Sequence, residues 1–160
     1  YVRAKTMEAI EATHKKVDTA LKAGGDAVGA QTVIATMPGQ LPLACNNRLN
    51  ELFVTNAKIA EPNVAVKDAG HFSASTDMGD VSHLLPVIHP FIGGVDGFLH
   101  TADFHVVDFK HAVLLPAKAF AMMIIDLLAD DAELARQIKA EHHPLLTKEE
   151  YIAKLDKYFQ

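Results

Sequence analysis

Cysteine is almost absent from this 160-residue sequence, in which Cys45 is the only one. A single cysteine cannot form an intrachain disulfide, and this is compatible with a reducing cytoplasm. Zinc sites built from cysteine clusters are excluded for the same reason. A lone cysteine is also more often a small buried hydrophobe than a thiol nucleophile. We therefore expect a cytoplasmic protein whose chemistry does not depend on sulfur.

The sequence also has little positive charge and no long uninterrupted apolar run. Its 15 Lys and Arg are outnumbered by 20 Asp and Glu, giving a formal net charge of −5, whereas nucleic-acid binding needs clustered Lys and Arg. Residues 112–129 form the longest apolar stretch, but Pro116, Lys118 and Asp126 interrupt it before the ~18 residues that span a bilayer. We expect a buried core helix there, and neither nucleic acid nor membrane as a partner.

Several familiar signatures are missing. The sequence begins without Met or a signal peptide, and residues 1–3 look like the end of a strand, which predicts a fragment of a longer protein. Gly93 and Gly94 do not precede a helix in the pattern of a phosphate-binding loop, and the nucleophile elbow G-x-S-x-G is absent. These absences argue against a P-loop enzyme and a serine hydrolase.

What is present fits a globular α/β protein of one domain or parts of two, with 49% hydrophobic residues. Alternation of β-branched residues predicts strands at 31–39 and 87–94, while residues 63–70 fit either a short strand or an extended arm. Helical spacing and capping residues predict the helices. These run from the N-cap Thr6 through Leu21, from Leu49 through Asn56, from Phe109 to Leu128, from a cap at Asp130 to His142, and from a capping box at Thr147 and Glu150.

An unusual polar stretch, FSASTDMGDVSHLLPVIHPF, occupies residues 72–91. Buried polar groups cost free energy unless each finds a partner, so the stretch predicts either a well-bonded turn or a functional site. Asp77 and Asp80 have three interpretations: helix capping, an Asx-turn around Gly79, or lining of a site. The sequence leaves these alternatives open. The polar residues are Ser75, Thr76, Asp77, Asp80, Ser82, His83 and His89.

His100 is the strongest candidate metal ligand among the nine histidines. It follows a glycine-rich strand end, where a loop can present a side chain into a cleft. Neutral imidazole is the commonest metal ligand, and Asp103 or a backbone carbonyl could orient its other nitrogen. The alternative is an ordinary loop histidine. We interpret His105 and His111 as surface residues near the start of a helix.

The segments STDMGDVSHLLPVIHPF and HTADF, followed by the long apolar helix, resemble the C-terminal part of metallopeptidase family 20. This family of di-zinc amidohydrolases and peptidases includes aminoacylase and carnosinase, and the similarity is greatest to the branch that holds aminobenzoyl-glutamate hydrolase and β-alanyl-lysine dipeptidase. The resemblance covers essentially the whole chain. It implies an α/β fold in which residues 1–40 are the second half of a ferredoxin-like lid, through which the family dimerises. Residues 41–160 would be the C-terminal part of the catalytic domain.

The resemblance also implies a function and a site. In the family, two zinc ions (manganese or cobalt as alternatives) act with a glutamate base to hydrolyse the amide bond of small N-acyl amino acids or dipeptides. His100 matches the last metal ligand in chain order, and Thr76, Asp77 and Asp80 match the loop beside the metal and substrate. The family's H-x-D and Glu–Glu motifs are absent, so the general base is expected upstream and this chain alone should be inactive. The alternative is a non-catalytic dimerisation or binding module.

Overall fold

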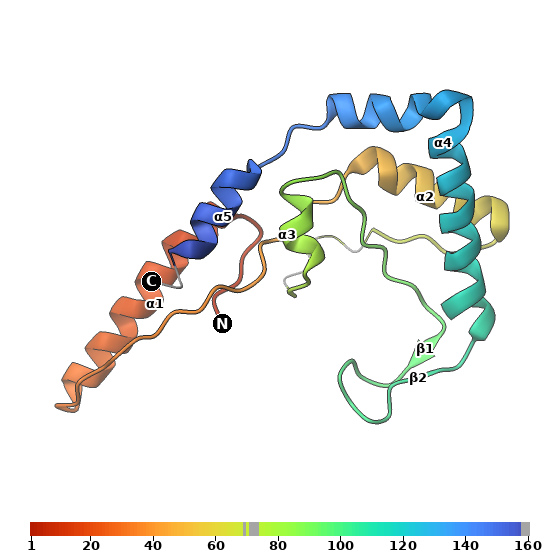
Figure 1. The fold of residues 1–160 in the computed structure, drawn as a ribbon. Coiled ribbons are helices and arrows are strands. Elements are labelled where there is room, and N and C mark those ends of the chain that lie inside the picture. Colours follow the sequence, from red (N-terminus) through yellow and green to blue (C-terminus); the bar gives the residue numbers. More distant parts are fainter. Residues whose placement is uncertain (69, 71–73, 158–160) are drawn as a thin grey trace. The chain divides into compact units, whose positions relative to one another are not determined.

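The computed structural model describes residues 1–68, 70 and 74–157 (Figure 1). Phe72 and Ser73 of the polar stretch, and the last residues of the terminal helix predicted from sequence, lie outside the described residues. The elements in chain order are α1 (Met7–Ala27), α2 (Asn47–Ala60), α3 (Met78–Ser82), β1 (Val95–Asp96), β2 (His105–Val106), the π-helix η1 (Lys110–Leu114), α4 (Leu115–Glu141) and α5 (Lys148–Asp156).

The chain forms two compact units, each assembled from separate stretches of sequence. The first unit comprises Tyr1–Ala44, Ala69–Leu85 and Pro144–Gln160, and the second comprises Cys45–Asp68 and Pro86–His143. The first unit therefore holds α1, α3 and α5, whereas the second holds α2, the two strands, η1 and α4. The expected division into a lid at 1–40 and a catalytic part at 41–160 stays a prediction.

The hydrophobic core of the second unit lies between α2 and α4. Leu49, Phe53 and Ala57 recur every four residues and so share one face of α2. They pack with Ala119 and Met123 of α4 and with Ile138 near the end of that helix, all of which are buried. The rings of Phe53 and Phe120 lie 4.9 Å apart between centroids in a tilted arrangement. This face confirms the helix predicted from Leu49 through Asn56.

One buried amide is placed within this core. Asn56 is 2% exposed, and its side-chain nitrogen donates to the Leu52 carbonyl at 3.1 Å and to the Asp126 carboxylate at 2.7 Å. A buried polar group needs such partners to offset its desolvation. The first bond lies within α2, and the bond to Asp126 links α2 to α4.

The long helix differs from the expectation of a buried core helix. It begins with a π-helical turn, and its backbone is interrupted at 129–132, where three residues adopt positive φ. The predicted break after Leu128 and the end at His142 are therefore confirmed, but Asp130 lies inside the break with φ +48° and does not adopt the extended backbone of an N-cap.

The exposure of this helix was predicted wrongly from sequence. Lys110–Glu141 includes a window long and apolar enough to cross a membrane by length and composition, and only 11% of that window is buried. Pro116, Lys118 and Asp126 therefore interrupt the apolar stretch less than the sequence suggested. The core helix of a soluble protein can meet the same criteria of length and composition.

In the first unit, α1 begins at the predicted N-cap, where the Thr6 side chain accepts the Ala9 N–H at 3.3 Å. The chain then reverses at Gly29 and returns beside the helix, and the Thr32 hydroxyl donates to the Leu21 carbonyl at 3.4 Å (Figure 1). The strand predicted at 31–39 is not formed: this segment makes no backbone hydrogen bond to another described residue. A strand is defined by its partner, and the described residues supply none.

Two other predictions from sequence are resolved in opposite ways. The capping box of α5 is confirmed, since Thr147 and Glu150 each bond the other's backbone N–H. The strand predicted at 87–94 is wrong, because among the described residues only Val95–Asp96 pairs, antiparallel with His105–Val106. A capping box is encoded within four residues, whereas strand pairing depends on residues distant in sequence.

The α2–α4 core can be tested with a matched pair of leucine and isoleucine truncations on α2. Leu49 is 8% exposed and Ile59 is 63% exposed. We expect Leu49→Ala to lower the free energy of unfolding by about 2–5 kcal/mol, and Ile59→Ala to change it by less than about 0.5 kcal/mol. Urea denaturation measures both. Equal losses for the two variants would contradict the assignment of the core.

Candidate functional site

The start of α3 explains two of the predicted site residues. The Asp77 carboxylate accepts the Met78 N–H at 3.1 Å, and the Thr76 hydroxyl donates to the same carboxylate at 3.2 Å. The Gly79 N–H donates to the Thr76 carbonyl at 2.9 Å and closes the turn. The Asp77 carboxylate therefore caps the first N–H of α3, in agreement with the capping interpretation, although its own backbone is helical (φ −60°, ψ −24°) and not extended. Its side chain stays exposed, so capping leaves the carboxylate accessible.

Asp80 bonds a distant part of the first unit. Its Oδ1 accepts the Leu41 N–H at 3.1 Å, a link between residues 39 positions apart. Burial raises the pKa of the Asp80 carboxyl, the Leu41 N–H and nearby His83 oppose that rise, and Asp77 adds to it. The ionised form is thus disfavoured at a position where a neutral amide oxygen could accept the same N–H.

Ser82 and His83 are the most deeply buried of the polar residues named in this stretch, with 1% and 6% exposure. The Ser82 hydroxyl donates to the Gly79 carbonyl at 2.6 Å and accepts the Ala44 N–H at 3.0 Å. The His83 Nε2–H donates to the Pro42 carbonyl at 2.9 Å. The sequence predicted that the polar groups of this stretch would be hydrogen-bonded if buried. It did not predict which residues bond them, because Ala44 and Pro42 lie 38 and 41 residues away.

The backbone of α3 packs closely against the backbone of residues 41–44, to which its side chains are hydrogen-bonded. Gly79 is buried, and a Cβ at this position would overlap the carbonyl oxygen of Leu41. Only glycine permits this approach of two backbones. We call the set Asp80, Ser82 and His83, with the bonds that they make to residues 41–44, the α3 clasp.

His100 lies in the loop between β1 and β2, in the second unit. Gly94, with φ +88°, begins this hairpin, and its carbonyl accepts the N–H groups of Val107 and Asp108 at 3.0 Å each. His100 itself has φ +66° and is exposed. Its ring has no hydrogen-bond partner among the described residues. The hairpin therefore presents an unengaged imidazole to its surroundings.

The Asp103 carboxylate was expected to orient the His100 ring, and this expectation is wrong. That carboxylate accepts a short hydrogen bond from the Thr101 hydroxyl, which also approaches the Phe98 carbonyl at 2.6 Å. The Asp103 carbonyl accepts a ring N–H of His105 at 2.6 Å. Asp103 thus stabilises the loop around His100 without contacting its ring.

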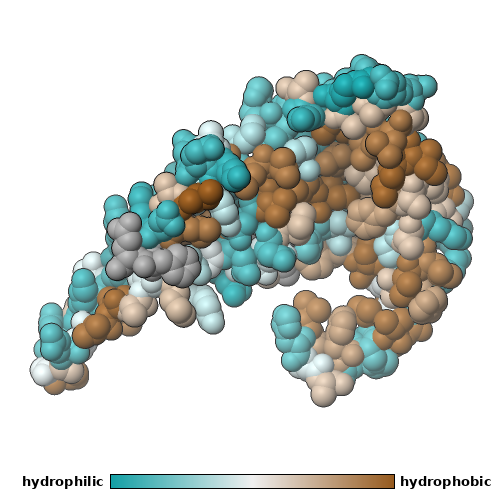
Figure 2. All heavy atoms as spheres, viewed as in Figure 1, coloured by the Kyte–Doolittle hydropathy of each residue, from teal (hydrophilic) through white to brown (hydrophobic). Residues whose placement is uncertain are grey.

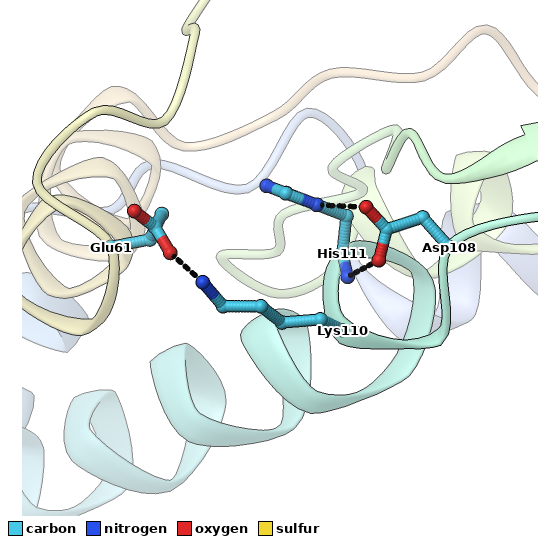
Figure 3. A network of polar contacts seen from close by, with 4 residues as sticks. All are labelled: Glu61, Asp108, Lys110 and His111. Carbon is cyan, nitrogen blue, oxygen red and sulfur yellow. Dashed lines mark hydrogen bonds and ion pairs between the residues drawn. The ribbon is translucent and has the colours of Figure 1, made fainter.

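A polar network at the start of η1 was not predicted from sequence (Figure 3). The two carboxylate oxygens of Asp108 accept the His111 backbone N–H at 3.1 Å and its ring Nδ1–H at 2.6 Å. The His111 side-chain bond is the main cause that lowers the pKa of Asp108. Lys110 pairs with Glu61, which raises the pKa of the lysine and lowers that of the glutamate. The network fastens the start of the long helix to the end of α2.

The described residues do not by themselves form a metal centre. They contain no group of three or more His, Cys, Asp or Glu side chains placed to hold a metal ion, whereas zinc needs about four ligands. The structure brings Thr76, Asp77 and Asp80 together in one turn of the first unit, while His100 belongs to the second. The residues present therefore do not fit a complete di-zinc site, although His100 is free to supply one ligand.

Comparisons with protein-family models, with curated proteins and with solved structures give no match to this chain. The resemblance to metallopeptidase family 20 therefore depends on the motifs at 75–91 and 100–104 and on the apolar helix after them. Membership of that family stays a prediction.

Asp80→Asn tests whether the negative charge of Asp80 lowers the stability of the folded protein. Because the folded-state pKa of Asp80 is raised above the usual value of about 3.9, its ionised form costs stability above the folded pKa, and this cost disappears as the pH falls below the unfolded value. We expect Asp80→Asn to be as stable as the wild type or more stable at pH 7, since the amide oxygen still accepts the Leu41 N–H. The difference should shrink toward pH 3.

Thermal denaturation between pH 3 and 7 measures this effect, with Asp80→Ala as the control. Asp80→Ala leaves the Leu41 N–H without its acceptor and should be less stable by about 1–3 kcal/mol. A large loss in Asp80→Asn at pH 7 would contradict the account.

Proposed function

We propose that this chain is the C-terminal part of a metal-dependent amidohydrolase that acts on the amide bond of small N-acyl amino acids or dipeptides. In this proposal His100 is a metal ligand, and Thr76, Asp77 and Asp80 lie beside the substrate. The metal is zinc, as two ions in the complete enzyme, with manganese or cobalt as alternatives. The enzyme is cytoplasmic and dimerises through a lid that includes residues 1–40.

The observation that carries the proposal is the state of His100. Its imidazole is exposed and unbonded to any described residue, although polar neighbours in the same loop are bonded to one another. Its backbone has φ +66°, a conformation that glycine or asparagine adopts with less strain. Residues kept in such conformations tend to occur at functional sites. An exposed imidazole without a hydrogen-bond partner has a ring nitrogen available to a metal.

The chain's own contribution to such an enzyme is limited to binding and orientation. A bound metal would polarise the amide carbonyl and lower the pKa of the attacking water. The described residues supply one candidate ligand, His100, whereas each of the two ions needs about four, so the other ligands and the general base would come from outside the described residues. We assign no catalytic step to a residue of this chain.

A second candidate is a non-catalytic binding or dimerisation module, and the surface of α4 favours it. Ala117, Ala121, Ile124 and Leu128 recur at three- and four-residue spacing on one exposed face, while Leu115, Ala119 and Met123 of the same helix are buried. Figure 2 shows apolar atoms exposed along this helix. An exposed apolar face of this kind indicates an interaction surface in either case. The complete reading frame discriminates: upstream H-x-D and Glu–Glu motifs favour the hydrolase, and their absence favours the module.

Replacement of His100 tests the metal-binding role in the product of the complete reading frame. We expect His100→Ala to lose at least about one of two zinc equivalents and most amidase activity, because one coordinating nitrogen is removed. His105→Ala is the matched control, since its ring is bonded to the Asp103 carbonyl in the same hairpin. Metal analysis and turnover of N-acyl amino acids measure the effect. Full metal content and activity in His100→Ala would show that another residue is the ligand.

Asp77→Asn separates capping from contact with substrate. Asn caps a helix about as well as Asp, so we expect little change in melting temperature. If the exposed carboxylate interacts with the substrate or orients a ligand, loss of its charge should lower kcat/KM at least about tenfold. A variant with unchanged kinetics would leave Asp77 with a capping role alone.

A further inference from the structure

The short helix α3 cannot be stable by itself. It has five residues, Met78–Ser82, whereas isolated helices shorter than about 12 residues are marginal in water because nucleation is costly. Its formation must therefore depend on contacts outside the helix. Those contacts are the bonds of the α3 clasp, which reach the backbone at Leu41, Pro42 and Ala44.

Residues 41–44 depend on α3 in return. They belong to no helix or strand, so their N–H and C=O groups have no ladder to join and must find other partners. Asp80 and Ser82 accept two of the N–H groups, and His83 donates to one carbonyl. The His83 carbonyl also accepts the Leu146 N–H at 3.0 Å, which adds a third chain segment.

We propose that α3 and residues 41–44 order together as one cooperative element, with Ser82 and His83 as positioning residues for the Thr76–Asp77 turn. The turn directly precedes α3. The hydrogen bond that closes it is donated by the N–H of Gly79, which is a residue of α3. Loss of the bonds of the α3 clasp therefore also removes the ordered conformation of Thr76 and Asp77. The functional consequence rests on the proposed function. A ligand that binds at the turn would stabilise the conformation of residues 41–44. In return, a ligand or partner that binds residues 41–44 would strengthen binding at the turn.

The charged and titratable neighbours do not replace the clasp. His83, which directly follows α3, lowers the pKa of Glu8 of α1 and of Asp80 of α3 through charge, and Asp80 raises the pKa of Tyr151 of α5 in the same way. These act through charge at longer range, whereas the clasp is a set of direct bonds to backbone atoms. A variant that keeps the donor at position 83 but cannot titrate should therefore preserve the element.

Backbone amide exchange measured by NMR on the whole 160-residue chain tests the coupling. Ser82→Ala removes the acceptor of the Ala44 N–H, so exchange at Ala44 must become faster whatever the mechanism. If the element is cooperative, exchange at Leu41, Gly79 and Asp80 should also become faster by at least about tenfold. Ser75→Ala, which removes an exposed hydroxyl from the same stretch, should leave these four amides unchanged.

His83 provides a second, independent pair of variants. His83→Gln keeps a side-chain N–H near the position of Nε2 and should retain protection at Leu41 and Gly79, while His83→Leu should lose it. Amides of α1, in the same unit as the α3 clasp, report whether that unit is still folded. If Ser82→Ala unfolds the whole first unit, the comparison of His83→Gln with His83→Leu decides.

Faster exchange confined to Ala44 in Ser82→Ala, with Leu41 and Gly79 still protected in His83→Leu, would overturn the proposal. These measurements need neither metal nor substrate. Failure of the cooperative element would therefore leave the role of His100 standing, and loss of the hydrolase proposal would leave the coupling as a structural property of the chain.

Discussion

The backbone of residues 41–44 imposes the central constraint on the first unit. A segment without secondary structure must satisfy its polar groups individually, and Asp80, Ser82 and His83 do so with side chains that are themselves partly or fully buried. The polar stretch that seemed out of place among apolar residues is therefore mainly a bonded turn. Thr76 and Asp77 remain at its outer end, where Asp77 caps the helix and stays exposed.

Hydrophobic burial is concentrated in the second unit, between α2 and α4. One face of α4 packs on Leu49 and Phe53, while another, with Ile124 and Leu128, is apolar and exposed. A helix that is apolar on both faces is typical of an element covered on both sides. This agrees with the proposal that the chain supplies one part of a larger hydrolase, and equally with a binding module. The site chemistry, not the apolar surface, has to distinguish them.

The features that were predicted from sequence are those encoded over a few residues. Thr6 and the Thr147–Glu150 box define helix starts through local bonds. The spacing from Leu49 through Asn56 predicts the apolar face of α2, and the break after Leu128 follows from a change in pattern. The strands at 31–39 and 87–94 failed because pairing depends on distant partners. The bonds of Ser82 and His83 were missed for the same reason, and the bonds from His111 to the Asp108 carboxylate because an Asp–His pair three residues apart is not distinctive in sequence. The candidate role of His100 came from resemblance and stays a prediction.

The most direct test of the hydrolase proposal is anomalous diffraction at the zinc absorption edge from crystals of the complete reading-frame product. The account predicts a zinc ion about 2.0–2.1 Å from a ring nitrogen of His100, with its remaining protein ligands supplied from outside these 160 residues. A zinc centre whose ligands exclude His100, or crystals grown with zinc that show no ordered ion near this hairpin, would contradict it.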